Sequence, residues 1–291
     1  MIFLPDFYDR FQCLASGCRH SCCRGWEIDV DNDSAAFYRS LDGDLGQALS
    51  AALFEDEEGW HFRLDARERC PFLREDRLCR LICELGEDSL CDICALHPRF
   101  FQEIGDHELW GLGLSCEAVS ALLWQGEGPL HFVSDEDDRP LDFPALLETL
   151  GLDFPRSLLR YRPQISRERI EQVCTAMAGT EPIDEHWTRE VAAAARAPLP
   201  SGDPFRGREE AWQRVYQYWL YRQLDRLEDL GPQALTDYAG LCLDYLLLQP
   251  GDPVQAVRRL SEQIEYSTEN VERLLGQFGI RSSEFGINEN L

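Results

Sequence analysis

Ten of the twelve cysteines in this chain lie before Glu117, and they stand in groups rather than singly. Thiolates are ligands for soft metals, and a reducing compartment offers little else that would hold so many of them in one region. The pattern therefore predicts that this region folds around a bound metal or an iron–sulfur cluster. The groups are Cys13, Cys18, Cys22 and Cys23, then Cys70, then Cys79 and Cys83, then Cys91 and Cys94, and finally Cys116.

A disulfide scaffold is the alternative reading of an even number of cysteines. Two features argue against it. A chain of 291 residues does not need covalent staples, and the adjacent Cys22 and Cys23 cannot easily pair with each other. The opening residues lack a positive segment followed by a long apolar one, so we expect no signal peptide. No run of about twenty apolar residues occurs, so we expect no membrane span and a cytoplasmic protein.

The charge of the chain bears on its partners. Its formal net charge is −25, and binding to phosphate backbones needs clustered lysine and arginine. We therefore expect no nucleic-acid partner. A lysine-bearing protein substrate would be attracted, although the acidity is equally explained by solubility alone. The hydrophobic content of 44% indicates a folded protein with one large or two modest domains.

We expect a mainly α fold with a few short strands, divided near residue 160 into a cysteine-cluster metal-binding domain (1–160) and a helical domain (161–291). In the first part the patterns predict a helix from Asp33 or Ser34 to Leu41, a helical segment over 46–54, strands over 60–65 and within 107–116, and a helix over 117–124.

Helical periodicity dominates the second part. Ser166 is expected to cap a helix that ends at Gly179, and Asp252 to cap one that starts at Pro253. Between them we expect a long helix over 209–230 ended by Gly231 and Pro232, and a buried helix over 234–248. A last helix is predicted with Val271, Leu274, Leu275 and Phe278 on its inner face, before Gly279. Cys174 and Cys242 fall on apolar helix faces and are expected to be core residues.

The spacing of the cysteines leaves the kind of metal open. Cys91-x-x-Cys94 resembles half of a zinc site, while zinc and a cubane cluster each take four ligands. Nine or ten thiols therefore predict two sites, or one site with spectators, and Cys83 is the favoured spectator. The C-x-x-x-C-x-x-C pattern of radical enzymes is absent. His20 and His97 are favoured as non-ligands.

The order of these motifs resembles one family. F-x-C-x4-C-x3-C-C-x2-W-E-I, C-P-F-L, L-G-E-x2-L-C-x2-C-x3-P-R-F and L-S-C-E, between Phe11 and about Leu123, resemble the flagellin lysine-N-methylases, within a cysteine-cluster family described as zinc- or iron-chelating. Glu117 stands where members often have a proline, and His97 where others carry an aromatic residue.

The resemblance implies transfer of methyl groups from S-adenosylmethionine to lysine side chains of flagellin, with a 4Fe-4S iron–sulfur cluster or zinc. It implies the metal ligands Cys13, Cys18, Cys22, Cys23, Cys70, Cys79, Cys94 and Cys116, with Cys91 next. The alternatives are a non-enzymatic protein that stores, delivers or senses a metal, and a structural zinc module.

No catalytic residue and no S-adenosylmethionine pocket can be named from the sequence. Gly111 and Gly113 lack the third glycine of a dinucleotide-type turn, so we do not expect a doubly wound methyltransferase domain. Trp26, with the acids Glu27, Asp29 and Asp31, would suit a cationic ligand. A core tryptophan beside solvated acids is the favoured alternative.

Overall fold

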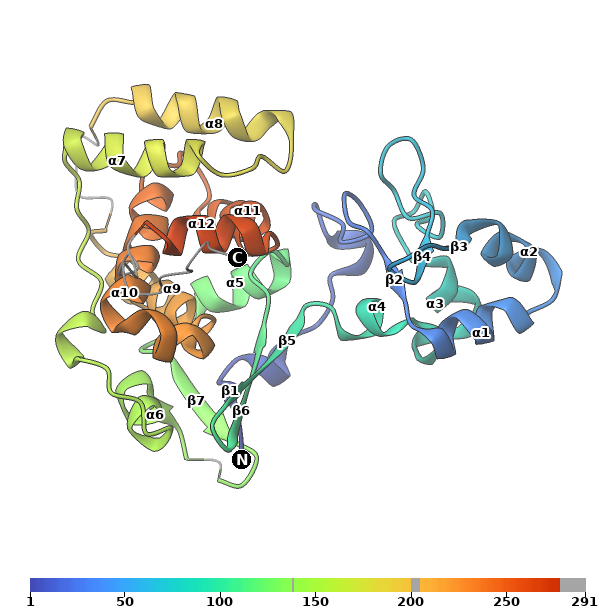
Figure 1. Cartoon of the computed structure of the whole chain (residues 1–291), viewed down its shortest axis with the longest axis horizontal. Coiled ribbons are helices and arrows are strands. Elements are labelled where there is room, and N and C mark those ends of the chain that lie inside the picture. Colours follow the sequence, from blue (N-terminus) through green and yellow to red (C-terminus); the bar gives the residue numbers. More distant parts are fainter. Residues whose placement is uncertain (138, 200–204, 278–291) are drawn as a thin grey trace, which may run out of the picture. The chain divides into compact units, whose positions relative to one another are not determined.

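The computed structural model describes residues 1–137, 139–199 and 205–277, which form two compact units (Figure 1). The cysteine unit comprises residues 12–100 and 116–118. The helix–sheet unit comprises residues 1–11 and 101–115 and the described residues from 119 onward. This division differs from the single boundary expected near residue 160, because strands from the first half of the chain complete a sheet that belongs with the C-terminal helices.

About 51% of the described residues are helical, and the rest include two sheets. The expected preponderance of helix is confirmed, but the fold is mixed, with more strands than the sequence patterns indicated. Within the described ranges, no helix combines the length and the apolar composition that a membrane crossing requires.

The larger sheet joins strands that are far apart in the sequence. Its order is β5-β6-β1-β7-β8. β1 pairs in parallel with β6, with Phe3 opposite Leu109, and antiparallel with β7, with Phe3 opposite Ser134. The strands are β1 (Ile2–Pro5), β5 (Arg99–Ile104), β6 (His107–Leu112), β7 (His131–Ser134) and β8 (Leu141–Asp142).

Eight helices accompany this sheet among the described residues. α7 packs on α8, and α10 packs on α7, α9, α11 and α12. α8 was not predicted from the sequence, and it buries Trp187 and Val191. The helices are α5 (Glu117–Gln125), α6 (Phe143–Thr149), α7 (Arg167–Ala178), α8 (Glu185–Arg196), α9 (Glu209–Tyr221), α10 (Leu227–Leu246), α11 (Pro253–Ile264) and α12 (Thr268–Leu275).

Two tyrosines of α9 fix this helix to the sheet. The Tyr218 hydroxyl lies 2.7 Å from both the amide nitrogen and the carbonyl oxygen of Leu112. The Tyr221 hydroxyl lies 3.0 Å from the Phe3 carbonyl and 2.9 Å from the Trp110 carbonyl. Because both side chains are fully buried, these bonds satisfy groups that water cannot reach.

The helix caps follow the sequence, whereas the longest predicted helix does not. Ser166 accepts a hydrogen bond from the Arg169 amide and Asp252 from the Val254 amide, as predicted. The helix expected over 209–230 is wrong, since α9 ends at Tyr221 and α10 begins at Leu227. The predicted break at Gly231 is confirmed, because this residue (φ 76°, ψ 163°) is non-helical and two helical stretches of α10 meet there at a kink. The predicted positions of Phe278 and Gly279 lie outside the described residues.

The cysteine unit is built from short elements around a small core. Its helices are α1 (Asn32–Ser40), α2 (Gly43–Ala52), α3 (Arg80–Leu85) and α4 (Asp92–Leu96). Its antiparallel sheet has the order β2-β4-β3, from β2 (Asp29–Val30), β3 (Leu53–Glu55) and β4 (Trp60–Phe62). Tyr38, Leu49, Phe62 and Phe72 are almost fully buried in it.

Two boundaries in this unit differ from expectation. Asp31, rather than Asp33 or Ser34, caps α1, because its carboxylate accepts from the Ser34 amide at 2.8 Å. The strand predicted over 60–65 stops at Phe62, the last residue of β4 to pair with β3.

We predict that Glu265→Ala destabilises the helix–sheet unit strongly. Glu265 Oε1 lies 2.5 Å from Arg222 Nε, and these side chains are only 1% and 11% exposed. Removing the carboxylate leaves a buried guanidinium uncompensated, which lowers the free energy of unfolding by about 3–5 kcal/mol. Chemical denaturation followed by tryptophan fluorescence measures this. The control is Glu148→Ala in the exposed pair with Arg156, where we expect a loss of at most about 1 kcal/mol. Equal losses would contradict the prediction.

Candidate metal centre

All ten cysteines that precede Glu117 lie in the cysteine unit, and all carry free thiols. Cys116 joins the others because residues 116–118 return to this unit after the chain has passed through β5 and β6. The remaining two cysteines, Cys174 of α7 and Cys242 of α10, are buried in the helix–sheet unit. Their predicted place in the core is confirmed.

Five of these cysteines pack against one hydrophobic core, and we call them the inner thiols. They are Cys23, Cys70, Cys79, Cys91 and Cys94. Cys70 is 8% exposed and Cys91 1%. The backbone holds them together: the Cys70 amide donates to the Cys23 carbonyl at 2.9 Å, and the Cys94 amide donates to the Cys91 carbonyl at 3.0 Å. Cys79 is placed by a backbone bridge to Leu73.

The inner thiols influence one another electrostatically. Burial raises the pKa of Cys70 to about 12, and the neighbouring Cys23 and Cys79 add to this effect. The hydrogen bond between Cys91 and Cys94 raises the pKa of Cys94 and lowers that of Cys91. Because two adjacent thiolates destabilise each other in a buried site, one thiol of the Cys91–Cys94 pair keeps its proton more strongly than the other.

A second set of cysteines, the outer thiols, is more accessible. It comprises Cys13, Cys18, Cys22 and Cys116, of which Cys13 and Cys22 are exposed and the others half-buried. The hydrogen bond with Cys23 raises the pKa of Cys22, and the charges of Cys23, Cys13 and Cys116 add to this effect. The same bond lowers the pKa of Cys23 to about 7. The adjacent Cys22 and Cys23 therefore link the two sets.

A buried carboxylate, which the sequence analysis did not assign to the site, adjoins the outer thiols. Glu117 is 6% exposed and accepts hydrogen bonds from the Arg19 amide at 2.8 Å and from Arg19 Nε at 2.5 Å. It also accepts from Cys18 Sγ at 3.7 Å. Burial opposes the charge of Glu117, but the bonds from Arg19 outweigh it and lower the pKa of the carboxyl. The signal in the sequence that could have identified Glu117 as a site residue is its position directly after Cys116.

Each thiol set supplies as many sulfur ligands as a zinc ion or a cubane cluster requires. The donor type therefore fits a soft metal. Within the described part of the chain, however, no three Cys, His, Asp or Glu side chains are arranged as a formed metal site. The metal and its nine predicted cysteine ligands stay predictions. Cys83, the expected spectator, lies exposed on α3.

The acids after the first cysteine group mostly have structural partners. Asp31 accepts from the Ser34 and Asp92 amides and so connects α1 with α4. Asp29 Oδ1 lies 3.0 Å from His61 Nδ1. Glu27 and Asp29 are exposed, as the alternative of solvated acids expects, whereas Trp26 is half-buried and not a core residue. Burial lowers the pKa of His97 and keeps its imidazole neutral.

The fold and the two thiol sets define a cysteine-cluster protein, and comparison with known proteins gives its family. No family model and no solved structure matches the chain. It is 32% identical over 123 residues to a lysine-N-methylase of Salmonella typhimurium, covering 40% of this chain and 31% of that protein. A lysine-N-methylase of Salmonella choleraesuis is 31% identical over 123 residues, which again cover 40% of this chain and 31% of that protein. The flagellar biosynthetic protein FliU of Salmonella muenchen is 32% identical, with 73% of its length covered.

The chain belongs to the family of these lysine-N-methylases and FliU. The resemblance given by the motifs is thereby confirmed. The chain spans about a third of the length of the two lysine-N-methylases.

We predict that the stability contributed by His61 decreases as the pH rises. Burial opposes the charge of this imidazole, but Asp29 at 3.0 Å and Asp56 at 3.1 Å outweigh burial and raise its pKa above 6.5. A raised pKa means that the stabilisation is complete below 6.5 and is lost as the pH rises through the folded-state value. The midpoint of thermal unfolding of His61→Gln should therefore lie further below that of the wild-type protein at acidic pH than at alkaline pH. His186→Gln, at an exposed position of α8, is the control. A deficit independent of pH would contradict the prediction.

Proposed function

We propose that this protein acts in the cytoplasm and transfers methyl groups from S-adenosylmethionine to lysine side chains of flagellin, with a metal or iron–sulfur cluster held by its thiols. The observation that carries the proposal is the family, whose members are named lysine-N-methylase and flagellar biosynthetic protein FliU. The 123 matched residues are 40% of this chain, so the activity is inferred from the shared part.

The reaction sets requirements that the chain must meet. A neutral lysine Nζ attacks the sulfonium methyl carbon, the carbon–sulfur bond breaks, and S-adenosylhomocysteine and one proton leave. Lysine must first lose its proton, which needs burial or a nearby base. The formal net charge of −25 favours the approach of lysine-bearing surfaces.

The predicted metal would be held by the two thiol sets. Cys23, Cys70, Cys79 and Cys94, with Cys91 next, are the inner ligands, and Cys13, Cys18, Cys22 and Cys116 the outer ones. When bound, a zinc ion or an iron–sulfur cluster would compensate the thiolate charges and supply Lewis-acid or redox chemistry. The exposure of Cys13 and Cys22 also favours the second candidate, a non-enzymatic protein that delivers a metal to a partner.

We predict that the inner thiols are required for metal binding and for stability. Cys70→Ser removes a predicted ligand and places a hydroxyl in an apolar core, so it should lower both the metal content per chain and the midpoint of thermal unfolding. The measurements are metal analysis of anaerobically purified protein and thermal unfolding. Cys83→Ser, at an exposed position of the same unit, should retain the metal. If Cys70→Ser kept the full metal content, the inner thiols would not be ligands.

We predict methyl groups on lysines of flagellin incubated with the metal-replete protein and S-adenosylmethionine. Mass spectrometry of flagellin detects them. Cys22→Ser should abolish the modification, whereas Cys242→Ser, in the core of the other unit, should retain it. If flagellin from the same organism stays unmodified after anaerobic incubation with the metal-bound protein, the result favours the metal-delivery alternative.

A further inference from the structure

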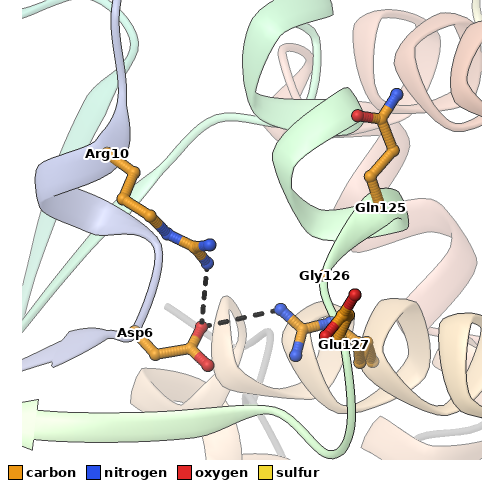
Figure 2. Close-up of a pocket in the computed structure, with 6 residues that line it drawn as sticks. Asp6, Arg10, Gln125, Gly126 and Glu127 are labelled. Carbon is orange, nitrogen blue, oxygen red and sulfur yellow. Dashed lines mark ion pairs between the residues drawn. The ribbon is translucent and has the colours of Figure 1, made fainter.

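The helix–sheet unit contains a polar cavity of about 490 Å³ (Figure 2). Three segments form it: the turn after β1, the end of α5, and α9. Figure 2 shows Asp6 and Arg10 on one side and Gln125, Gly126 and Glu127 on the other. The lining residues are Asp6, Arg10, Gln125, Gly126, Glu127 and Arg214. Its volume lies within the roughly 300–1,000 Å³ of small-molecule sites.

Arg214 of α9 lies at the buried side of this cavity, with its side chain only 1% exposed. Its Nε donates to the Leu123 carbonyl and its Nη1 to the Pro129 carbonyl, both at 3.1 Å. These bonds hold the guanidinium plane in place. A Cβ at Gly126 would lie 2.3 Å from Arg214 Nη2, so glycine is needed beside it. The missing side chain at position 126 therefore leaves room for the guanidinium group.

The remaining guanidinium nitrogen is not fully satisfied. Arg214 Nη2 lies 3.5 Å from Asp6 Oδ1, and within the described ranges neither atom has a hydrogen-bond partner. Burial lowers the pKa of Arg214, and Asp6 offsets this only in part. A buried charged group without its hydrogen bonds is costly unless a ligand completes them.

The charges around the cavity alternate in sign. Arg10 Nη2 lies 3.9 Å from Asp6 Oδ1, so two guanidinium groups flank one carboxylate. Exposed Glu127 adds a second carboxylate across the cavity. Two cations and two anions at separate positions suit a ligand that itself carries both charges. The cavity lining contains only polar residues and glycine, which disfavours an aromatic ring as its occupant.

We propose that this cavity binds an α-amino carboxylate group. The ligand carboxylate accepts hydrogen bonds from Arg214 Nη2 and from Arg10, and its ammonium group donates to Glu127. The amino-acid end of S-adenosylmethionine carries such a group. Naming S-adenosylmethionine as the ligand rests on the proposed function. A free amino acid carries the same group.

Calorimetric titration of the metal-loaded full chain tests the proposal. The probes are S-adenosylmethionine, S-adenosylhomocysteine, free methionine, free lysine and 5′-methylthioadenosine, which lacks the amino carboxylate. Arg10→Gln and Glu127→Gln should each weaken S-adenosylmethionine at least about tenfold and leave methylthioadenosine unaffected. Both residues are exposed, so these variants should fold, which circular dichroism checks. Arg139→Gln, in another exposed ion pair, should leave the affinity for S-adenosylmethionine unchanged.

The outcomes separate this proposal from the proposed function. Binding of S-adenosylmethionine with unchanged affinity in both variants overturns the cavity assignment and leaves methyl transfer standing. Binding of free methionine or lysine, but not of S-adenosylmethionine, with losses in both variants, supports the cavity as an amino-acid site and counts against methyl transfer. A folded wild-type protein that binds none of the amino carboxylates overturns the cavity assignment.

Discussion

The packing of the inner thiols against one core is the constraint on which the cysteine unit depends. Its helices are at most ten residues long, and helices of this length are marginal without tertiary packing. The packing comes from one small core, in which Cys70 and Cys91 occupy positions beside Tyr38, Phe62 and Phe72. Thiols at such positions pack as apolar groups when protonated and become costly when charged. Any metal that binds them therefore acts on folding as well as on chemistry.

The two units are interleaved along the chain, and this arrangement follows from strand pairing. β1 precedes the cysteine unit and β6 follows most of it, yet the two strands pair in parallel. A parallel pair requires a long crossover connection, and here the connection is a whole unit with its own core. The tyrosines of α9 then anchor the C-terminal helices to the same sheet. Neither unit is a continuous stretch of sequence.

Charged groups in the helix–sheet unit differ in how completely they are hydrogen-bonded. Asp244 accepts hydrogen bonds from the Tyr161 hydroxyl, the Gln164 amide and Arg169 Nε, so its carboxylate is well satisfied inside the core. Arg214 and Asp6 face each other at 3.5 Å beside a cavity, each with an atom that has no hydrogen bond within the described ranges. The first arrangement stabilises a fold, and the second has capacity for a ligand.

Features that depend only on neighbouring residues could be predicted from the sequence. Ser166 and Asp252 cap their helices as predicted, because a cap needs only its own side chain and an amide two or three residues on. The burial of Cys174 and Cys242 follows from helical periodicity. The ordered cysteine motifs indicated the family. Tertiary packing decided which cysteines lie against the core of the cysteine unit: Cys23 does, and the adjacent Cys22 does not. It also decided the unit boundary and the cavity that unites Asp6, Glu127 and Arg214. These features arise from packing between residues far apart in the chain, for which local patterns carry no signal.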